Sequence, residues 1–151
     1  MAIDVDSGLY LEGRGLRLKW CSSPEELRRL TRPDYCVEPP GTRGFLVLGW
    51  NDRVFGGLAC QVMATFEASR PNLSGVRLVF QYPDGIHSEP AGFEWLGSYL
   101  AAHFGPPLFI QDDGEQGVGR WAIPGVSLRH EYFNGMGGGH YLFIFPNEAD
   151  A

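Results

Sequence analysis

The fold is decided by residues 60–82, which read CQVMATFEASRPNLSGVRLVFQY. The first half of this stretch alternates polar and apolar side chains, with apolar ones at Cys60, Val62, Ala64 and Phe66. The second half alternates in the same way, with apolar side chains at Val76, Leu78, Phe80 and Tyr82. A period of two is typical of a strand with one buried face. Since residues 71–75 carry turn-forming residues, the stretch predicts an antiparallel β-hairpin.

Further strands are expected on both sides of this hairpin. Ten Phe, six Tyr and four Trp favour a sheet, and 21 Gly and 11 Pro supply turn signals between short strands. Alternating or apolar runs predict strands at residues 16–20, 45–50, 108–111, 120–123, 126–133 and 140–145. Turns are expected at Asn51-Asp52, at Pro124-Gly125 and at residues 134–139, and irregular loops at 32–43 and 112–119.

Two helices are expected among these strands. Ser23, Pro24 and Glu26 suit the N-cap, the first helical position and the reciprocal position of a capping box. They predict a short helix over residues 24–31. A second, amphipathic helix is predicted over residues 92–104 by apolar side chains at helical spacing, at Phe93, Leu96, Leu100 and Phe104. The Gly-Pro-Pro run that follows ends it.

The order of these elements predicts the fold class. Each half of the chain has a helix followed by about three consecutive strands, which suggests an internal duplication. Meander strands with helices on one face give a two-layer α+β fold with a mostly antiparallel sheet and two helices on one face. A length of 151 residues is the usual size of one domain, so residues 1–151 are interpreted as a single domain.

The charge and the cysteine content indicate which partners and which cellular compartment to expect. The net charge is −6, and the densest basic stretch, Arg28, Arg29 and Arg32, is too small to bind nucleic acid. Residues 1–6 lack the features of a signal peptide, and no apolar run approaches the ~20 residues of a membrane span. Three cysteines without CxxC spacing fit a reducing compartment. We therefore expect a cytoplasmic protein with neither a nucleic-acid partner nor a membrane partner.

Two acidic groups are the candidate partner-binding residues. Asp84, His87 and Glu89 lie in a loop that leads to the second helix, and Asp112, Asp113 and Glu115 form an acidic, glycine-flanked loop. Both groups would suit the Lys and Arg residues of a basic protein. The first group could also ligate a metal, but its spacing matches no metal motif. Solvated loops are the plain alternative for both groups. No catalytic residue, metal ligand or cofactor is predicted.

Three other features have structural interpretations. Cys60 is expected to be buried, because nothing near it in the sequence would lower its pKa. The glycines of residues 135–139 are expected at a hairpin tip, since strand-like sequence rather than a helix follows them. His130 and His140 flank that tip, and we expect them to face each other across the hairpin in a structural role.

The second half resembles a class of small bacterial proteins. The residues that carry the resemblance are Phe93-Glu94-Trp95-Leu96, the helix end at Phe104-Gly105-Pro106-Pro107, Trp121, and the strand at 126–132. This pattern is similar to immunity proteins encoded beside toxins of type VI secretion or contact-dependent inhibition systems. The resemblance implies a small, non-enzymatic protein that covers the active site of its toxin.

Three functions follow as hypotheses. The first is a protein-binding module, a cytoplasmic immunity protein that neutralises a basic toxin by occluding it. The second is a small enzyme or ligand-binding domain with a pocket between helix and sheet, using His87, Asp84 or His130. The third is an adaptor whose exposed sheet edge pairs with a second copy.

Overall fold

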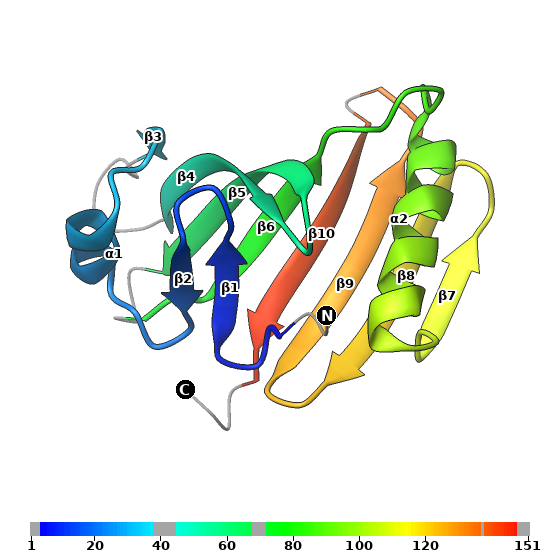
Figure 1. Cartoon of the computed structure of the whole chain (residues 1–151). Helices are drawn as coiled ribbons and strands as arrows, with labels where there is room; N and C mark the ends of the chain where they lie inside the picture. Colours follow the sequence, from blue (N-terminus) through cyan, green and yellow to red (C-terminus); the bar gives the residue numbers. More distant parts are fainter. Residues whose placement is uncertain (1–3, 38–44, 68–71, 137, 148–151) are drawn as a thin grey trace.

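The hairpin predicted from residues 60–82 forms, and it lies within a sheet of eight antiparallel strands in the described part of the chain. The structure is a computed structural model that describes residues 4–37, 45–67, 72–136 and 138–147. Its elements, in chain order, are β1 (Gly8–Leu11), β2 (Leu16–Lys19), α1 (Pro24–Leu30), β3 (Tyr35–Val37), β4 (Phe45–Val54), β5 (Leu58–Glu67), β6 (Gly75–Phe80), α2 (Glu89–Phe104), β7 (Phe109–Asp112), β8 (Gln116–Ile123), β9 (Val126–Phe133) and β10 (Gly139–Pro146). The prediction of an α+β fold on a mostly antiparallel sheet is confirmed (Figure 1).

The strand order relates the two halves of the chain. It runs β3-β4-β5-β6-β10-β9-β8-β7 across the large sheet. Each half therefore contributes a helix followed by a four-stranded meander, and the two meanders join through their last strands, β6 and β10. The expected order of a helix leading strands in each half is present, with four strands where about three were predicted.

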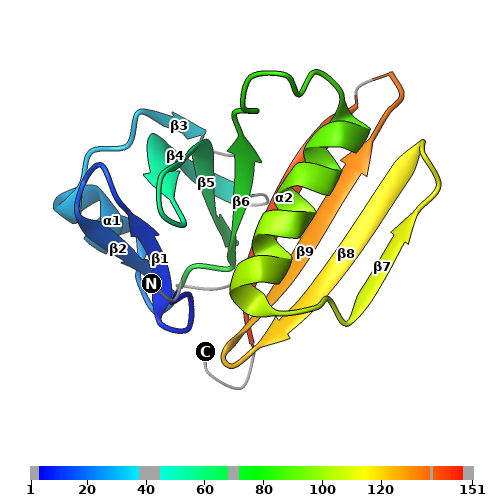
Figure 2. The same ribbon diagram turned by 45° about the vertical axis from the view of Figure 1, so that its right-hand side comes forward.

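One side of this sheet is covered by two different elements. α2 lies across β8, β9 and β10, and β1 of the β1–β2 hairpin contacts β4. Both covering elements lie on the same side of the sheet, and α1 lies beside the hairpin (Figures 1 and 2). The hairpin therefore occupies the place over the first meander that α2 occupies over the second. The two halves therefore share the order of their strands and connections, but a hairpin covers the first meander and a helix covers the second.

Both helices begin with the same local chemistry. The side chains of Ser23 and Ser88 accept hydrogen bonds from the N–H groups of Glu26 and Ala91, and a proline stands in the first turn of each helix. An N-cap oxygen and a proline satisfy or remove donors that the helix itself cannot pair. α2 begins at Glu89, three residues before the predicted start, because Ser88 caps it. It ends at Gly105, whose φ of 83° suits glycine.

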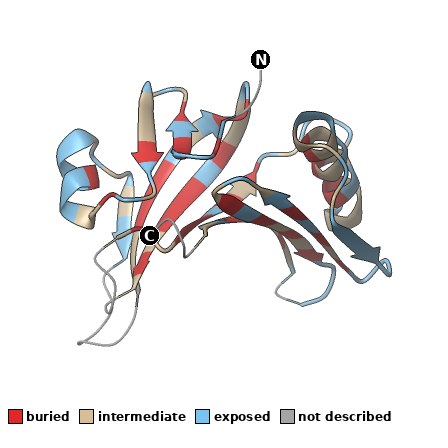
Figure 3. Cartoon of the chain, turned by 90° about the horizontal axis from the view of Figure 1, so that it is seen from below, coloured by how far each residue is buried: buried red, intermediate tan, exposed pale blue. Residues whose placement is uncertain are grey.

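The core lies between the sheet and its cover. Its largest fully buried side chains are Trp50, Tyr132, Leu9, Leu11, Leu18, Leu27, Leu48, Leu78, Leu96, Leu100, Leu128 and Leu142. Figure 3 shows that most of the buried residues lie in the strands of the large sheet, with others in α2 and the hairpin. Cys60 belongs to this core at 5% exposure, and burial raises the pKa of its thiol to about 12. Its predicted structural role is consistent with both observations.

Three local predictions are wrong. Asn51 and Asp52 do not form a turn, because β4 continues to Val54 and pairs with β5 along its whole length. The loop expected at 112–119 ends early, since β8 begins at Gln116. Residues 35–37 of the expected irregular segment form β3, while residues 38–44 lie outside the described part of the chain.

Candidate functional site

The large sheet has one covered face and one uncovered face. Its strands alternate between the two, as β9 shows: Val126, Leu128, His130 and Tyr132 are buried, whereas the residues between them are half-buried or exposed. The second set lies on the face away from α2 and the β1–β2 hairpin. Figures 1 and 2 show no described helix or strand over this face, so we call it the uncovered face.

One residue from each strand forms a line across the uncovered face. Strand pairing places these residues directly opposite one another in the order Tyr35, Gly49, Met63, Arg77, Phe143, Arg129, Arg120 and Phe109. We call this line the transverse row. With strands about 4.8 Å apart, it crosses the full width of the sheet. Three arginines lie between a Tyr–Gly–Met end and a Phe end.

Aromatic rings support two of these arginines. The guanidinium carbon of Arg129 lies 4.7 Å from the ring centre of Phe143 and 5.5 Å from that of Phe145, and those two rings are stacked. The guanidinium carbon of Arg77 lies 5.3 Å from the ring centre of Tyr141. These are cation–π contacts, which position the guanidinium over the ring and leave its N–H groups free to donate hydrogen bonds.

The row also brings two like charges together. Arg120 and Arg129 are directly opposite on β8 and β9, an arrangement that destabilises a sheet. Glu131 offsets part of this repulsion by pairing with Arg129, since Glu131 Oε2 lies 3.2 Å from Arg129 Nε. That ion pair lacks hydrogen-bond geometry, because the same Nε is buried without a hydrogen-bond partner. The opposed pair of Arg120 and Arg129 therefore carries a repulsion that the fold does not require, which favours a role in binding.

A second buried polar group on the row lacks a partner. The Tyr35 hydroxyl is buried and makes no hydrogen bond within the described residues. Its ring lies flat against Gly49, where a Cβ would fall 1.8 Å from the Tyr35 ring carbon Cζ. Buried groups without partners are uncommon in native proteins. Tyr35 and Arg129 therefore mark the uncovered face as the candidate site.

The predicted partner-binding residues lie at one end of the molecule, where the loop before α2 and the β7–β8 turn both project (Figure 1). Asp84 and His87 are exposed in the first loop, and Asp112, Asp113 and Glu115 are exposed in the second. Glu89 is different, because it accepts a hydrogen bond from the Tyr82 hydroxyl. The sequence thus predicted two groups that the structure places at the same end.

Several of these carboxylates also hold the backbone. Asp112 accepts hydrogen bonds from the Tyr132 hydroxyl and from the N–H of Gly114. Asp113 accepts from the N–H groups of Glu115 and Gln116, and these bonds lower the pKa of its carboxyl. The β7–β8 turn is therefore built by its own acidic residues. Their use as a contact for a basic partner stays a prediction.

The two histidines that flank the β9–β10 tip meet, as predicted. His130 and His140 are 0% and 5% exposed, and their Nε2 atoms are in hydrogen-bond contact. His140 Nδ1 lies 2.9 Å from the Tyr82 hydroxyl oxygen, which in turn donates to Glu89. Burial lowers the pKa of His140 to about 4, and burial together with the neighbouring His140 holds the pKa of His130 well below its usual value. Both rings are therefore neutral near pH 7.

A hollow of about 380 Å³ lies between the β1–β2 hairpin and the C-terminal half of α2. Its walls include Tyr10, Arg17, Phe55, Tyr99 and His103. The residues named for an enzyme, Asp84, His87 and His130, do not line it. His130 is enclosed in the core, whereas the other two are exposed in a loop. The structure does not bring those three residues together in this hollow.

The exposed edge of the sheet is the feature behind the third hypothesis. All four residues of β7 are exposed, and Phe109 and Ile110 are 47% and 57% exposed. An apolar edge strand can pair with another chain. Self-association through β7 stays a prediction, which light scattering tests.

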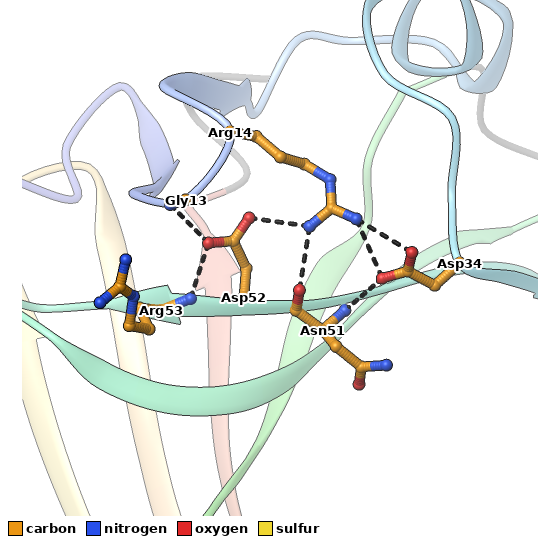
Figure 4. Close-up of polar contacts among 6 residues, drawn as sticks. All are labelled: Gly13, Arg14, Asp34, Asn51, Asp52 and Arg53. Carbon is orange, nitrogen blue, oxygen red and sulfur yellow. Dashed lines mark hydrogen bonds and ion pairs between the residues drawn. The ribbon is translucent and has the colours of Figure 1, made fainter.

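A polar network joins the turn of the β1–β2 hairpin to β4 and to the residue before β3. Arg14, in the β1–β2 turn, donates to Asp52 of β4 and to both carboxylate oxygens of Asp34, and also to the carbonyl of Asn51 (Figure 4). Burial alone would raise the pKa of Asp52, but hydrogen bonds from the N–H of Arg53, from Arg14 and from the N–H of Gly13 outweigh it and lower that pKa. The carboxylate therefore stays charged, and its role is to hold the turn.

Removing Arg14 tests that role. We expect Arg14→Ala to lower the free energy of unfolding by about 2 kcal/mol, because the nearly buried Asp52 carboxylate keeps its charge and loses its cation. Urea denaturation measures the change. Arg53→Ala is the matched control, since Arg53 is exposed on the same strand and contributes only its backbone to the network. Equal losses for the two variants would contradict the assignment.

Comparison with known proteins supports the fold. No protein-family model matches the chain, and no curated protein matches it in sequence. Among solved structures, the chain is similar to YjgB, a DUF4309 family protein from Bacillus subtilis subsp. subtilis strain 168. The TM-score is 0.51 at 10% identity, and the match covers 89% of this chain and 85% of that one. At this identity the likeness shows a shared fold alone.

Two further observations concern the described residues. No group of three or more His, Cys, Asp or Glu side chains in them is placed to hold a metal ion. Neither of the described helices is long and apolar enough to cross a membrane.

Proposed function

We propose that the protein is a non-enzymatic binding module that docks a protein partner on the uncovered face of its sheet. The observation that carries this proposal is the transverse row. Arginine and large aromatic residues are enriched where protein partners bind most strongly. Here they lie in the middle of a broad, uncovered sheet. Rigid strands hold these side chains in place before the partner arrives, which reduces the entropy lost on binding.

The narrower form of the proposal is neutralisation of a toxin in the cytoplasm of a bacterium. Small size, net charge −6 and similarity of the second half to immunity proteins support it. A broad face suits occlusion, because it can cover the mouth of an active site without entering it. The acidic end, Asp84 to Glu89 and Asp112 to Glu115, would then contact basic residues of the toxin beside that mouth.

Capture from the native host tests the docking face. We expect the wild-type chain to recover one partner in a stoichiometric amount, and Phe143→Ser with Phe145→Ser to recover less than a tenth of it. The double variant removes the rings beneath Arg129. Leu30→Ser is the matched control, because Leu30 is 58% exposed on α1, away from the uncovered face.

Growth measurements test the toxin itself. Expression of the captured partner alone should arrest growth, and co-expression of the wild-type chain should restore it. A partner that is harmless on its own would contradict neutralisation while leaving the docking face in place. No stoichiometric partner, or equal capture by the double variant, would contradict the docking face.

A further inference from the structure

The charge of the uncovered face differs from that of the whole chain. The net charge is −6, yet three of the eight residues in the transverse row are arginines, on strands β6, β9 and β8. Clustered cations on an acidic protein need a reason, because they repel one another and are not required for solubility. Their contacts within the described residues leave much of their hydrogen-bonding capacity unused.

These arginines keep unused hydrogen-bonding capacity. Among the described residues, the Arg120 guanidinium has no ion-pair or hydrogen-bond partner. Arg77 is exposed, and its Nη2 lies 3.0 Å from the thioether sulfur of Met63, which is a weak acceptor. Arg129 has Glu131 at its Nε only. Each guanidinium carries five N–H donors, so most of these donors have no acceptor among the described residues.

The spacing of the three suits a chain of carboxylates. Arg120 and Arg129 are on adjacent strands, so their Cα atoms are about 5 Å apart. Arg77 and Arg129 are separated by one strand, β10, and so by roughly 10 Å. An extended segment advances about 3.3 Å per residue, so four residues laid along the row reach from Arg77 to Arg129. The planar guanidinium pairs with a carboxylate through two parallel hydrogen bonds.

Protein fits this surface better than nucleic acid does. Nucleic-acid bases stack on free aromatic faces, but Arg129 already covers the rings of Phe143 and Phe145 and Arg77 covers Tyr141. An overall charge of −6 would also repel a phosphate backbone beyond the few contacts the row could make. Carboxylates on a protein segment can instead accept hydrogen bonds from the guanidinium N–H groups that have no other acceptor.

We propose that the partner docks on the uncovered face with an acidic, extended segment whose Asp or Glu side chains pair with Arg120, Arg129 and Arg77. This inference rests on the proposed docking function and specifies the chemistry of the partner at that face. The contact is distinct from the one predicted for the acidic end, which would take basic residues of the same partner.

A peptide selection tests the proposal without the natural partner. A random dodecapeptide library is displayed and selected on the immobilised full-length chain, and the selected peptides are then titrated against three proteins. These are the wild type, Arg120→Gln, and the control Arg29→Gln, which removes an exposed arginine of α1. We expect selected peptides to be rich in Asp and Glu and to bind Arg120→Gln at least tenfold more weakly than the other two. Their dissociation constants should rise with salt.

Stability measurements on the same variants separate binding from folding. Because Arg120 opposes Arg129, Arg120→Gln should leave Tm unchanged or raise it. A fall in Tm would show that Arg120 serves the fold and would overturn the inference. The conservative Arg120→Lys keeps the charge but not the planar fork, and we expect it to restore part of the lost affinity.

The remaining outcomes distinguish this inference from the function on which it rests. Neutral or basic peptides that lose binding in the Phe143→Ser, Phe145→Ser variant would overturn the acidic segment and retain the docking face. Selection of no peptide that depends on the face would overturn both. Tighter binding of a dodecamer of polyuridylate, lost in Arg120→Gln, would replace the protein segment with nucleic acid.

Discussion

Lowering the pH from 6.5 to 4 should remove about 3 kcal/mol of folding free energy through His140 alone, with a further loss through His130. An unfolded histidine has a pKa near 6.5, whereas burial lowers the pKa of His140 to about 4 and holds that of His130 well below 6.5. Between those values the unfolded chain binds more protons than the folded one. Stability is therefore complete above pH 6.5 and falls as the pH decreases.

Burial keeps both rings neutral, and the hydrogen-bond chain is consistent with one neutral tautomer of each. Tyr82 uses its only proton to donate to Glu89, so its oxygen accepts from His140 Nδ1–H. His140 Nε2 is then the acceptor for His130 Nε2–H. His130 Nδ1 carries no proton in this arrangement, in agreement with its having no donor or acceptor partner. A proton added to His140 Nε2 would break its hydrogen bond with His130, whereas a proton added to His130 Nδ1 would place a charge in the core beside an atom that has no hydrogen-bond partner.

Urea denaturation at pH 7.5, 6, 5 and 4 measures the effect. The double variant His130→Leu, His140→Leu should flatten the dependence between pH 6.5 and 4, because paired polar groups are removed together. His87→Leu is the control, since His87 is exposed, and it should keep the wild-type dependence. Asp52 also has a lowered pKa, but its protonation contributes below pH 3.8, outside this window. An unchanged slope in the double variant would contradict the assignment.

Local chemistry explains which parts of the fold could be predicted. The start of α1 was predicted from Ser23 with Pro24, which act within a few residues. The same kind of signal at Ser88 with Pro90 was missed, so α2 begins three residues before its predicted start. The contact of His130 with His140 follows from a short hairpin tip, because eight paired residues on each side fix the register. Such features need only neighbouring sequence. The turn at Asn51 and Asp52 was wrong because the acceptors of Asp52 are filled by Gly13 and Arg14, far away in the chain.

The candidate site could not be predicted for the same reason. Arg77 and Phe143 become neighbours only because β6 pairs with β10, and Arg120 opposes Arg129 only in the register that β8 and β9 adopt. In the sequence each arginine is an ordinary outward-facing residue of a strand. The acidic loops attracted attention because their charges are adjacent in the chain. Tertiary pairing, rather than composition, gathers the row.

Leu142→Ala should lower the free energy of unfolding by about 2–5 kcal/mol, and both halves of the sheet should lose stability together. Leu142 of β10 lies opposite Leu78 of β6, and both are fully buried. This strand pair is where the sheet passes from one meander to the other. If the chain is a single domain, as its length predicts, damage at this junction cannot be confined to one half.

Amide hydrogen exchange on β5 and β9 measures that coupling, because these strands are central to the first and second meanders. We expect the exchange free energies of both strands to fall by the same amount in Leu142→Ala. Leu108→Ala, at a side chain 75% exposed, should change neither. Loss of protection in one meander alone would show two folding units, and the repeated order of helix and strands would then reflect two modules that unfold separately. Equal losses would instead mean that the uncovered face, which spans both meanders, is held as one rigid surface.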